Sequence, residues 1–197
     1  MSIFLFSIPA LSTPREIVII RHADKWNQKN YGPYLSPKGQ VRAEKFVSYY
    51  LSHFHKPDFI FASKPGDAKH PNESDSLRPF QTVMPLANEL TFLSKQNFII
   101  QTPYFQKQYL ALANDLLHQK KYQDKQILIA WHHGKINFLT RDLGVTKKLA
   151  KWKGDNFDMV YVLKYDVDGK LTSFQILKNQ YSVKNNVSWQ ALAHQSQ

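Results

Sequence analysis

The sequence predicts an α/β fold, a three-layer α/β/α sandwich whose central sheet is mainly parallel and ends in a late antiparallel hairpin. Two observations support this prediction. Short runs of apolar, mostly β-branched residues, typical of buried parallel strands, recur along the chain. Segments with apolar residues at helical spacing lie between these runs. Over roughly the first 145 residues the two kinds of segment alternate, as they do in proteins with parallel sheets.

Strands are expected at 17–20, 59–62, 98–100 and 127–131, where the apolar runs occur. Two further strands are expected at 159–163 and 171–177. Asp166-Val167-Asp168-Gly169 lies between these last two and is a hairpin turn signal. We therefore expect the hairpin at the end of the sheet.

The first helix is expected after Ser36-Pro37, which supply an N-cap and a proline at the first helical position. Its apolar residues fall at i, i+3, i+4, i+7 and i+8, which places them on one face. These residues are Ala43, Phe46, Val47, Tyr50 and Leu51.

Three more helices are expected from similar stripes. The second carries Phe80, Val83, Met84 and Ala87 on one side. Pro85 lies inside that pattern and should kink or restart the helix. The third carries Phe105, Tyr109, Leu112, Ala113, Leu116 and Leu117, and the last runs over about 135–143. The polar segment 65–76 contains turn signals and is expected to be an exposed loop.

Composition limits the class of protein and its partners. A chain of 197 residues with 43% hydrophobic residues can form one globular domain with a full core. The formal charge of +11 favours anionic partners, namely phosphorylated molecules, nucleic acid or an anionic membrane surface. Because most of the positive charge is lysine scattered along the chain, a specific nucleic-acid site is disfavoured.

The ends of the chain differ in composition from its middle. Residues 1–14 form an apolar N-terminal segment, 15–185 a single domain, and 186–197 a polar tail. Within the first segment, 1–12 resembles the end of a secretory signal, with an extra edge strand as the alternative. The default location is cytoplasmic, and an exported protein is expected if 1–12 is a signal. No apolar stretch reaches 18 residues, so no membrane span is expected.

Polar residues follow three of the expected strands. Arg21-His22 comes directly after the first, Ser63 after the second, and His132-His133-Gly134 after the 127–131 run. Open α/β sheets bind ligands beyond the carboxyl ends of their parallel strands. We therefore expect these groups to meet at one edge of the sheet.

Arg78 is a further candidate for this edge. It is one of only five arginines and stands at the start of the second helix, where free backbone N–H groups already favour an anion. A guanidinium there can clamp phosphate oxygens.

Other catalytic chemistries find less support in the sequence. The chain has no cysteine, no HExxH motif and no G-x-S-x-G motif. These absences disfavour a metal hydrolase and a serine hydrolase of the elbow type. We expect no metal and no cofactor. Of the catalytic chemistries considered, phosphoryl transfer to a histidine is the one that remains.

Four segments in the same order resemble the histidine phosphatase superfamily, the phosphoglycerate-mutase-like proteins. Arg21-His22 resembles its Arg-His-Gly signature, with Ala23 in place of the glycine. The segment 35–43 is similar to its Leu-Thr/Ser-x-x-Gly-x-x-x-Ala helix start, and Ser63 with 77–82 to its Ser…Arg-x-x-Gln-Thr segment. His133-Gly134 resembles its second histidine. The resemblance spans roughly residues 16–145.

The resemblance implies roles for these residues. His22 would attack phosphorus and form a phosphohistidine, which water then hydrolyses. Arg21, Arg78 and His133 would hold the phosphoryl oxygens and stabilise the transition state. The further candidates for substrate binding are Ser63, Lys25, Gln28 and His132.

The general acid is the main departure from the family pattern. Family members usually supply a Glu after the second helix or an Asp after the second histidine, but residues 98–113 contain neither and Gly134-Lys135 follows His133. The candidates for the acid are Asp24, Asp67, Glu73 and Asp75. Because an alkoxide leaving group needs a proton, a missing acid would favour phosphoanhydrides, phosphohistidine, aryl phosphates or weak activity.

The expected function is therefore a phosphatase that hydrolyses a phosphomonoester or phosphoanhydride through His22. Its substrate would be a phosphorylated small molecule or a phosphoprotein. The alternative is a weakly active or inactive phosphate-binding protein of the same fold. A mutase is disfavoured because it must also retain and reposition its product, and nucleic-acid binding by the basic surface is disfavoured as well. The sequence leaves the oligomeric state open.

Overall fold

The computed structural model describes residues 13–26, 32–178 and 181. A six-stranded sheet has the order β3-β2-β4-β1-β5-β6. Its strands are β1 (Glu16–Arg21), β2 (Phe59–Ala62), β3 (Ile100–Gln101), β4 (Gln126–Trp131), β5 (Val160–Tyr165) and β6 (Leu171–Leu177). The first four strands pair in parallel, whereas β5 is antiparallel to β1 and β6 is antiparallel to β5. The predicted fold class is confirmed, including the late hairpin.

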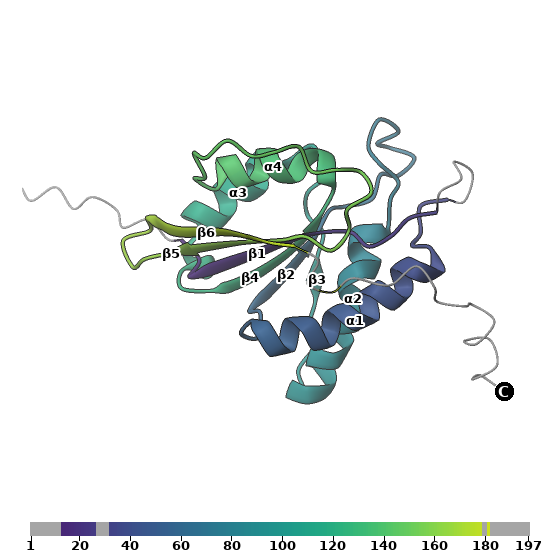
Figure 1. Ribbon diagram of the computed structural model, residues 1–197, viewed down its shortest axis with the longest axis horizontal. Coiled ribbons are helices and arrows are strands. Elements are labelled where there is room, and N and C mark those ends of the chain that lie inside the picture. Colours follow the sequence, from purple (N-terminus) through teal and green to yellow (C-terminus); the bar gives the residue numbers. More distant parts are fainter. Residues whose placement is uncertain (1–12, 27–31, 179–180, 182–197) are drawn as a thin grey trace, which may run out of the picture.

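Helices cover both faces of the sheet, as Figure 1 shows. The α-helices are α1 (Pro37–His53), α2 (Arg78–Ser94), α3 (Tyr109–His118) and α4 (His133–Asp142). α1 and α2 lie below the sheet in this view, and α3 and α4 lie above it. Ser36 is the N-cap of α1, as predicted, because its hydroxyl accepts a hydrogen bond from the backbone N–H of Gly39 at 3.1 Å. A 3₁₀ turn, Lys120–Tyr122, follows α3.

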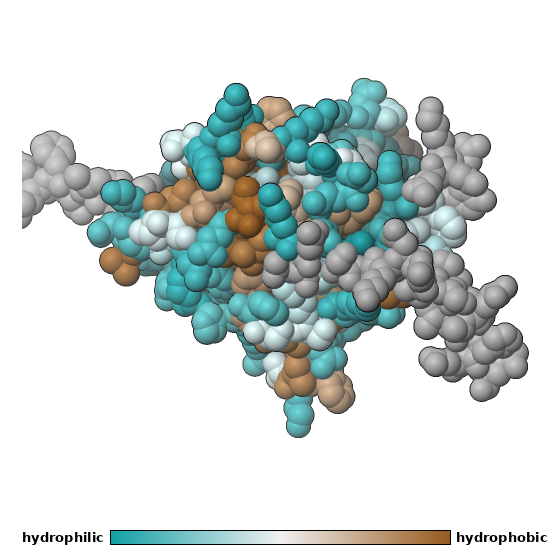
Figure 2. Space-filling model, viewed as in Figure 1, coloured by the Kyte–Doolittle hydropathy of each residue, from teal (hydrophilic) through white to brown (hydrophobic). Residues whose placement is uncertain are grey.

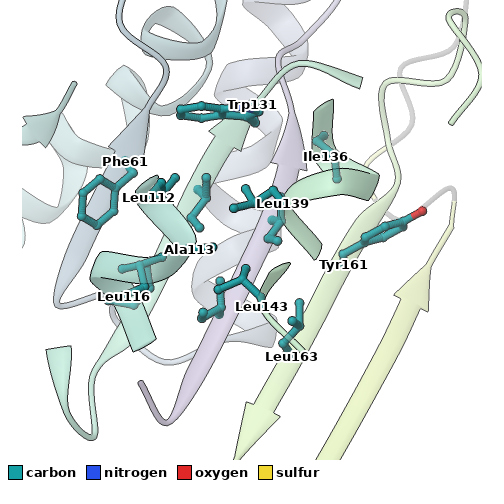
Figure 3. Close-up of a cluster of buried hydrophobic side chains, with 14 of the residues drawn as sticks. Phe61, Leu112, Ala113, Leu116, Trp131, Ile136, Leu139, Leu143, Tyr161 and Leu163 are labelled. Atoms are coloured by element: carbon teal, nitrogen blue, oxygen red, sulfur yellow. The ribbon is translucent and has the colours of Figure 1, made fainter. Parts of the chain in front are cut away.

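The core has two parts because the inward strand residues alternate between the two faces of the sheet. On one face, Ile17 and Ile19 of β1 belong to a buried cluster with the apolar residues of α3 and α4. Leu112 and Leu116 of α3 and Leu139 of α4 are labelled in Figure 3. On the other face, Val18 and Ile20 pack against α1 and α2. Every residue of β1 and β4 is buried, as expected of central parallel strands. These two strands are therefore a rigid base for the residues that follow them.

Three predicted boundaries were wrong. The strand at 98–100 is shifted to Ile100–Gln101, because the backbone N–H of Phe98 donates to Thr91 Oγ1 at 3.0 Å instead of joining the sheet. Phe105 lies outside α3 and bridges with Lys64 beside β2. The first strand of the hairpin begins at Val160 and extends to Tyr165, beyond the predicted 159–163, because it pairs with both β1 and β6.

Pro85 does not restart α2, which runs without interruption from Arg78 to Ser94. Buried side chains stand on both sides of the proline, with Val83 before it and Leu86 and Leu90 after it. The proline costs the helix a hydrogen bond, about 3 kcal/mol. Packing against the sheet on both sides of Pro85 offsets that cost.

The surface is largely hydrophilic in the view of Figure 2, apart from apolar areas such as the one at the C-terminal end of α2. Phe92 and Leu93 are exposed there, at 78% and 59%. In the part of the chain that the structure describes, no helix is both long and apolar enough to cross a bilayer. The predicted signal or edge strand at 1–12 and the predicted polar tail lie outside the described residues.

Candidate active site

The carboxyl ends of three parallel strands bring the predicted residues together. Arg21 pairs with Trp131 in the register of β1 and β4, so the residues that follow these two strands leave the sheet at the same level. The backbone N–H of His22 continues this pairing by donating to the Trp131 carbonyl at 3.0 Å. β2 ends at Ala62, level with Ala130 of β4, and Ser63 follows it. The predicted meeting of these groups at one edge is therefore observed.

His22 is buried, with 3% of its surface exposed. Its Nδ1 lies 2.7 Å from the Ala23 carbonyl oxygen. Because a carbonyl only accepts hydrogen bonds, Nδ1 carries the proton and Nε2 keeps its lone pair. Burial, then the nearby His132 and Arg21, hold the pKa of His22 well below its usual value. The ring is therefore neutral at pH 7, with the lone pair on Nε2.

Arg21 is buried beside His22, at 1% exposure, and binds the loop between α4 and β5. Its Nη1 donates to the carbonyls of Lys153, Gly154 and Asn156 at 3.3, 2.8 and 2.9 Å. Its Nε is buried without a hydrogen-bond partner. Burial lowers the pKa of Arg21 to about 10. The guanidinium thus holds a loop with one nitrogen and keeps an unused donor.

Arg78 begins α2, as predicted. Its Nη1 donates to the Gly32 carbonyl at 3.3 Å, and its Nε is buried without a partner. Burial lowers its pKa, although the charge of Asp75 acts in the opposite direction. Thr82, one turn further along α2, accepts from the backbone N–H of Ala23 at 2.8 Å. This hydrogen bond fixes the N-terminal end of α2 beside the segment that carries His22.

The two histidines after β4 have different partners. His132 is the N-cap residue of α4, and its Nε2 lies 3.0 Å from Ser63 Oγ. His133 is the first residue of the helix, and its Nδ1 is buried without a partner. Burial is the main cause that lowers the pKa of His132 to about 3 and that of His133 to about 4. Both rings are therefore neutral at pH 7.

Asp24, a candidate for the general acid, is held by cations. Arg42 of α1 donates to its two carboxylate oxygens at 2.5 and 3.4 Å, and Lys38 Nζ lies 3.6 Å from Oδ1. Asp24 and Arg42 are both buried, so they form a buried ion pair. Among the contacts of the described residues, this carboxylate pairs with cations and with none of the three histidines. Nothing in the sequence marks Arg42 as the partner of Asp24.

The other three acid candidates lie in or beside the 65–76 loop. Asp67 accepts from His70 at 2.6 Å, and this bond lowers the pKa of Asp67. Glu73 lies 3.4 Å from Lys107 Nζ, while its Oε2 is buried without a partner. Asp75 is exposed, and its charge acts on Arg78. None of the three has a hydrogen bond to His22, His132 or His133 among the contacts of the described residues.

The two remaining candidates for substrate binding are Lys25 and Gln28. Lys25 is exposed, and its charge acts on His133. Gln28 lies outside the described residues. Among the described residues, no three His, Asp or Glu side chains are grouped so that they could hold a metal ion.

The loop between α4 and β5 is the part of the site that sequence analysis missed. The ring of Phe157 lies under the Arg21 guanidinium, 3.9 Å from Cζ to the ring centroid, and 6.0 Å from the His22 ring. A side chain at Gly154 would lie 3.9 Å from His133 Nε2. The loop therefore forms a wall of the site. Its contacts to Arg21 Nη1 use backbone carbonyls, which leave no mark in the sequence.

Comparison with known proteins supports the fold. No protein-family model matches the chain, and no curated protein matches its sequence. One similar solved structure is the protein histidine phosphatase SixA in complex with tungstate, with a TM-score of 0.50 and 16% identity over 83% of this chain and 96% of that one. Another is mycobacterial glucosyl-3-phosphoglycerate phosphatase with inorganic phosphate, with a TM-score of 0.54 and 13% identity over 85% and 100%.

The chain therefore has the fold of the histidine phosphatase superfamily, which confirms, at the level of the fold, the resemblance seen in the sequence. Identities of this size show the fold alone. The site adds an independent observation, because a neutral histidine stands where that resemblance places the nucleophile.

Proposed function

We propose that the protein is a phosphatase that hydrolyses a phosphomonoester or phosphoanhydride through a phosphohistidine on His22. One observation carries the proposal. The buried, neutral His22 stands among buried nitrogen atoms that have no hydrogen-bond partner in the described part of the chain, namely the donors Arg21 Nε and Arg78 Nε and the ring nitrogen His133 Nδ1. Unsatisfied buried donors are costly to a folded protein, so a cluster of them beside a nucleophile is best explained by an anionic ligand.

The donors suit a phosphoryl group. Arg21 and Arg78 carry positive charge where the charge of the equatorial oxygens would increase, and His133 offers a ring nitrogen. The proton of His22 stays on Nδ1, which donates it in a hydrogen bond to the Ala23 carbonyl, so Nε2 is the nitrogen that attacks phosphorus. The P–O bond to the leaving group breaks as the P–N bond forms. Water then attacks the phosphohistidine, releases phosphate and restores the neutral ring.

The substrate is proposed to be a phosphorylated small molecule or a phosphoprotein. The two similar phosphatases named above were solved with tungstate and with inorganic phosphate. These ligands support the use of both anions as probes. Hydrolysis is proposed over a mutase reaction because a mutase must also retain its product in a second orientation.

The test compares His22→Ala with the wild type on 4-nitrophenyl phosphate. The wild type should release 4-nitrophenol and form an acid-labile phosphoenzyme, and His22→Ala should do neither. His118→Ala is the matched control, since His118 is exposed on α3 and bonds only to the Asn114 carbonyl. Equal turnover by wild type and His22→Ala would overturn the proposal.

A second candidate function, an inactive phosphate-binding protein, is favoured by one observation. In the described part of the chain, the charged side chains that act on His22 and His133 are the cations Arg21, Arg78, Lys25 and Lys151, and no carboxylate is bonded to either ring. This candidate predicts that the wild type binds tungstate but neither releases 4-nitrophenol nor becomes phosphorylated.

A further inference from the structure

The source of the proton for the leaving group is open in this site. The charged residues that perturb His22, His132 and His133 are, besides the histidines themselves, Arg21, Arg78, Lys25 and Lys151. Within the described residues, no carboxylate forms a hydrogen bond or ion pair with any of the three histidines. A proton donor beside His22 therefore has to be sought among other groups.

His132 has the geometry that such a donor needs. Its ring lies edge-on to the His22 ring, with centroids 5.3 Å apart and an angle of 67° between the planes. Ser63 Oγ, 3.0 Å from Nε2, fixes the ring, and both residues are buried, at 1% and 9% exposure for Ser63 and His132. The side chain does not cap α4, although His132 is the N-cap residue. Among the hydrogen bonds of the described residues, Ser63 is the one partner of the ring and none involves Nδ1.

We propose that His132, held in place by Ser63, is the proton donor to the leaving group of the substrate. The inference rests on the proposed function, since it assigns a step of the same reaction. His132 would be a catalytic residue and Ser63 a positioning residue. A histidine directly before His133 would then replace the carboxylate that was sought at Asp24, Asp67, Glu73 and Asp75.

Substrate binding would supply the proton. Without ligand the pKa of His132 is about 3, first because of burial and then because of Arg78, His133 and Arg21. The two cations, Arg21 and Arg78, belong to β1 and α2, whereas His133 at the start of α4 and Ser63 beside β2 are neutral. A phosphoryl dianion bound to the same cations offsets their effect and raises the pKa of His132. His132 would therefore bind a proton together with the substrate.

The two half-reactions then balance. In the first, the Nε2 lone pair of His22 forms the P–N bond, the P–O bond breaks, and the leaving oxygen takes both its electron pair and the Nδ1 proton of His132. In the second, neutral His132 takes a proton from the attacking water. The new P–O bond forms as the P–N bond breaks, and the electron pair returns to Nε2 of His22.

The test measures how kcat/KM depends on the leaving group, because kcat/KM reports the step in which that group departs. In His132→Gln the side-chain amide can take the place of Nε2 beside Ser63. An amide is not acidic enough, however, to give a proton to the leaving oxygen. For phenyl phosphate, whose leaving group is basic, kcat/KM should fall about 10²-fold. For 4-nitrophenyl phosphate, whose leaving group needs no proton, it should stay within about 3-fold of the wild type.

Two further variants complete the test. Ser63→Ala leaves the imidazole but removes its support, so it should show a smaller loss with the same preference for 4-nitrophenyl phosphate. If His132→Gln fails to fold, Ser63→Ala carries the test alone. His118→Gln, remote from the site on α3, should match the wild type on both substrates.

The outcomes separate this inference from the proposed function. An equal loss of kcat/KM on both substrates, or no loss on either, would overturn the role of His132 while His22-dependent turnover stands. No turnover of either substrate by the wild type would overturn the proposed function, and the role of His132 with it.

Discussion

The arginines near the carboxyl ends of the parallel strands are of two kinds, which differ in what neutralises their charge. Arg42 of α1 is paired with the carboxylate of Asp24, with its Nε 2.5 Å from Oδ2. Arg21 and Arg78 form no ion pair in the described part of the chain, and each keeps a buried Nε without a partner. Burying an unpaired charge is costly. The fold thus explains the paired arginine, whereas the unpaired ones are the residues whose charge the proposed phosphoryl ligand would neutralise.

The surroundings of the unpaired arginines support this distinction. Carboxylates do act on them from beyond ion-pair distance, Asp24 and Asp155 on Arg21 and Asp75 on Arg78. Backbone carbonyls solvate Arg21 Nη1 without cancelling its charge. The site thus keeps positive charge in a buried place, which is what a phosphoryl transition state requires.

Removal of an unpaired arginine should give the largest effect. Arg78→Ala should lower kcat/KM for 4-nitrophenyl phosphate by about 10²–10³-fold, because a donor to the phosphoryl oxygens is lost. Its thermal midpoint should stay near that of the wild type, since Arg78 contributes only a 3.3 Å hydrogen bond to the Gly32 carbonyl. A large drop in the midpoint would instead assign Arg78 to the fold.

Disruption of the paired arginine should have the opposite effect. Asp24→Asn leaves Arg42 buried without its counter-charge, which should lower the free energy of unfolding by about 3 kcal/mol in urea denaturation at pH 7. Asp124→Asn, the same change in an exposed pair with Arg15, is the matched control and should cost less than about 1 kcal/mol.

Turnover by the same variant tests Asp24 as the general acid. A purely structural role predicts that the folded Asp24→Asn protein loses the same factor of kcat/KM on phenyl phosphate and on 4-nitrophenyl phosphate. A selective loss on phenyl phosphate would assign the acid to Asp24 and contradict the role given to His132.

The sequence predicted those parts of the site that follow from the strands. His22, Ser63 and His133 each follow a parallel strand, and parallel strands end at one edge, so their meeting could be foreseen. The partners of Arg21 and Asp24 could not. Arg21 is held by backbone carbonyls of a loop more than 130 residues further along the chain, which any sequence would provide. Arg42 lies on a helix face that looked apolar, and only the fold shows that Asp24 reaches it.

Local hydrogen bonds explain where element boundaries were wrong. The backbone N–H of Phe105 donates to the side chain of Gln108 at 2.9 Å, which holds the chain outside α3 although Phe105 fits its apolar stripe. Apolar spacing records which residues are buried but not which backbone groups are bonded elsewhere. The prediction of helices and strands was therefore more accurate than the prediction of their ends.

The histidines beside the unpaired arginines should have the smallest and most specific effect, which is on how the free energy of unfolding depends on pH. His132 has a pKa of about 3 when folded, below its usual 6.5, so the unfolded chain binds a proton that the folded protein does not between these values. Stability should therefore fall as the pH drops below about 6.5, by at most about 1.4 kcal/mol per pH unit from His132 alone. His22 and His133, whose pKa values are also lowered, act in the same direction.

Urea denaturation at pH 7 and pH 5 measures this slope. His132→Gln should lose less stability than the wild type over this interval, whereas His118→Gln should follow the wild type. Saturating tungstate should flatten the slope of the wild type, because an anion on Arg21 and Arg78 removes part of the cause that keeps His132 neutral. If stability changed equally with pH in His132→Gln and in the wild type, His132 would not be held neutral in the folded protein. There would then be no physical reason for His132 to gain a proton when the substrate binds.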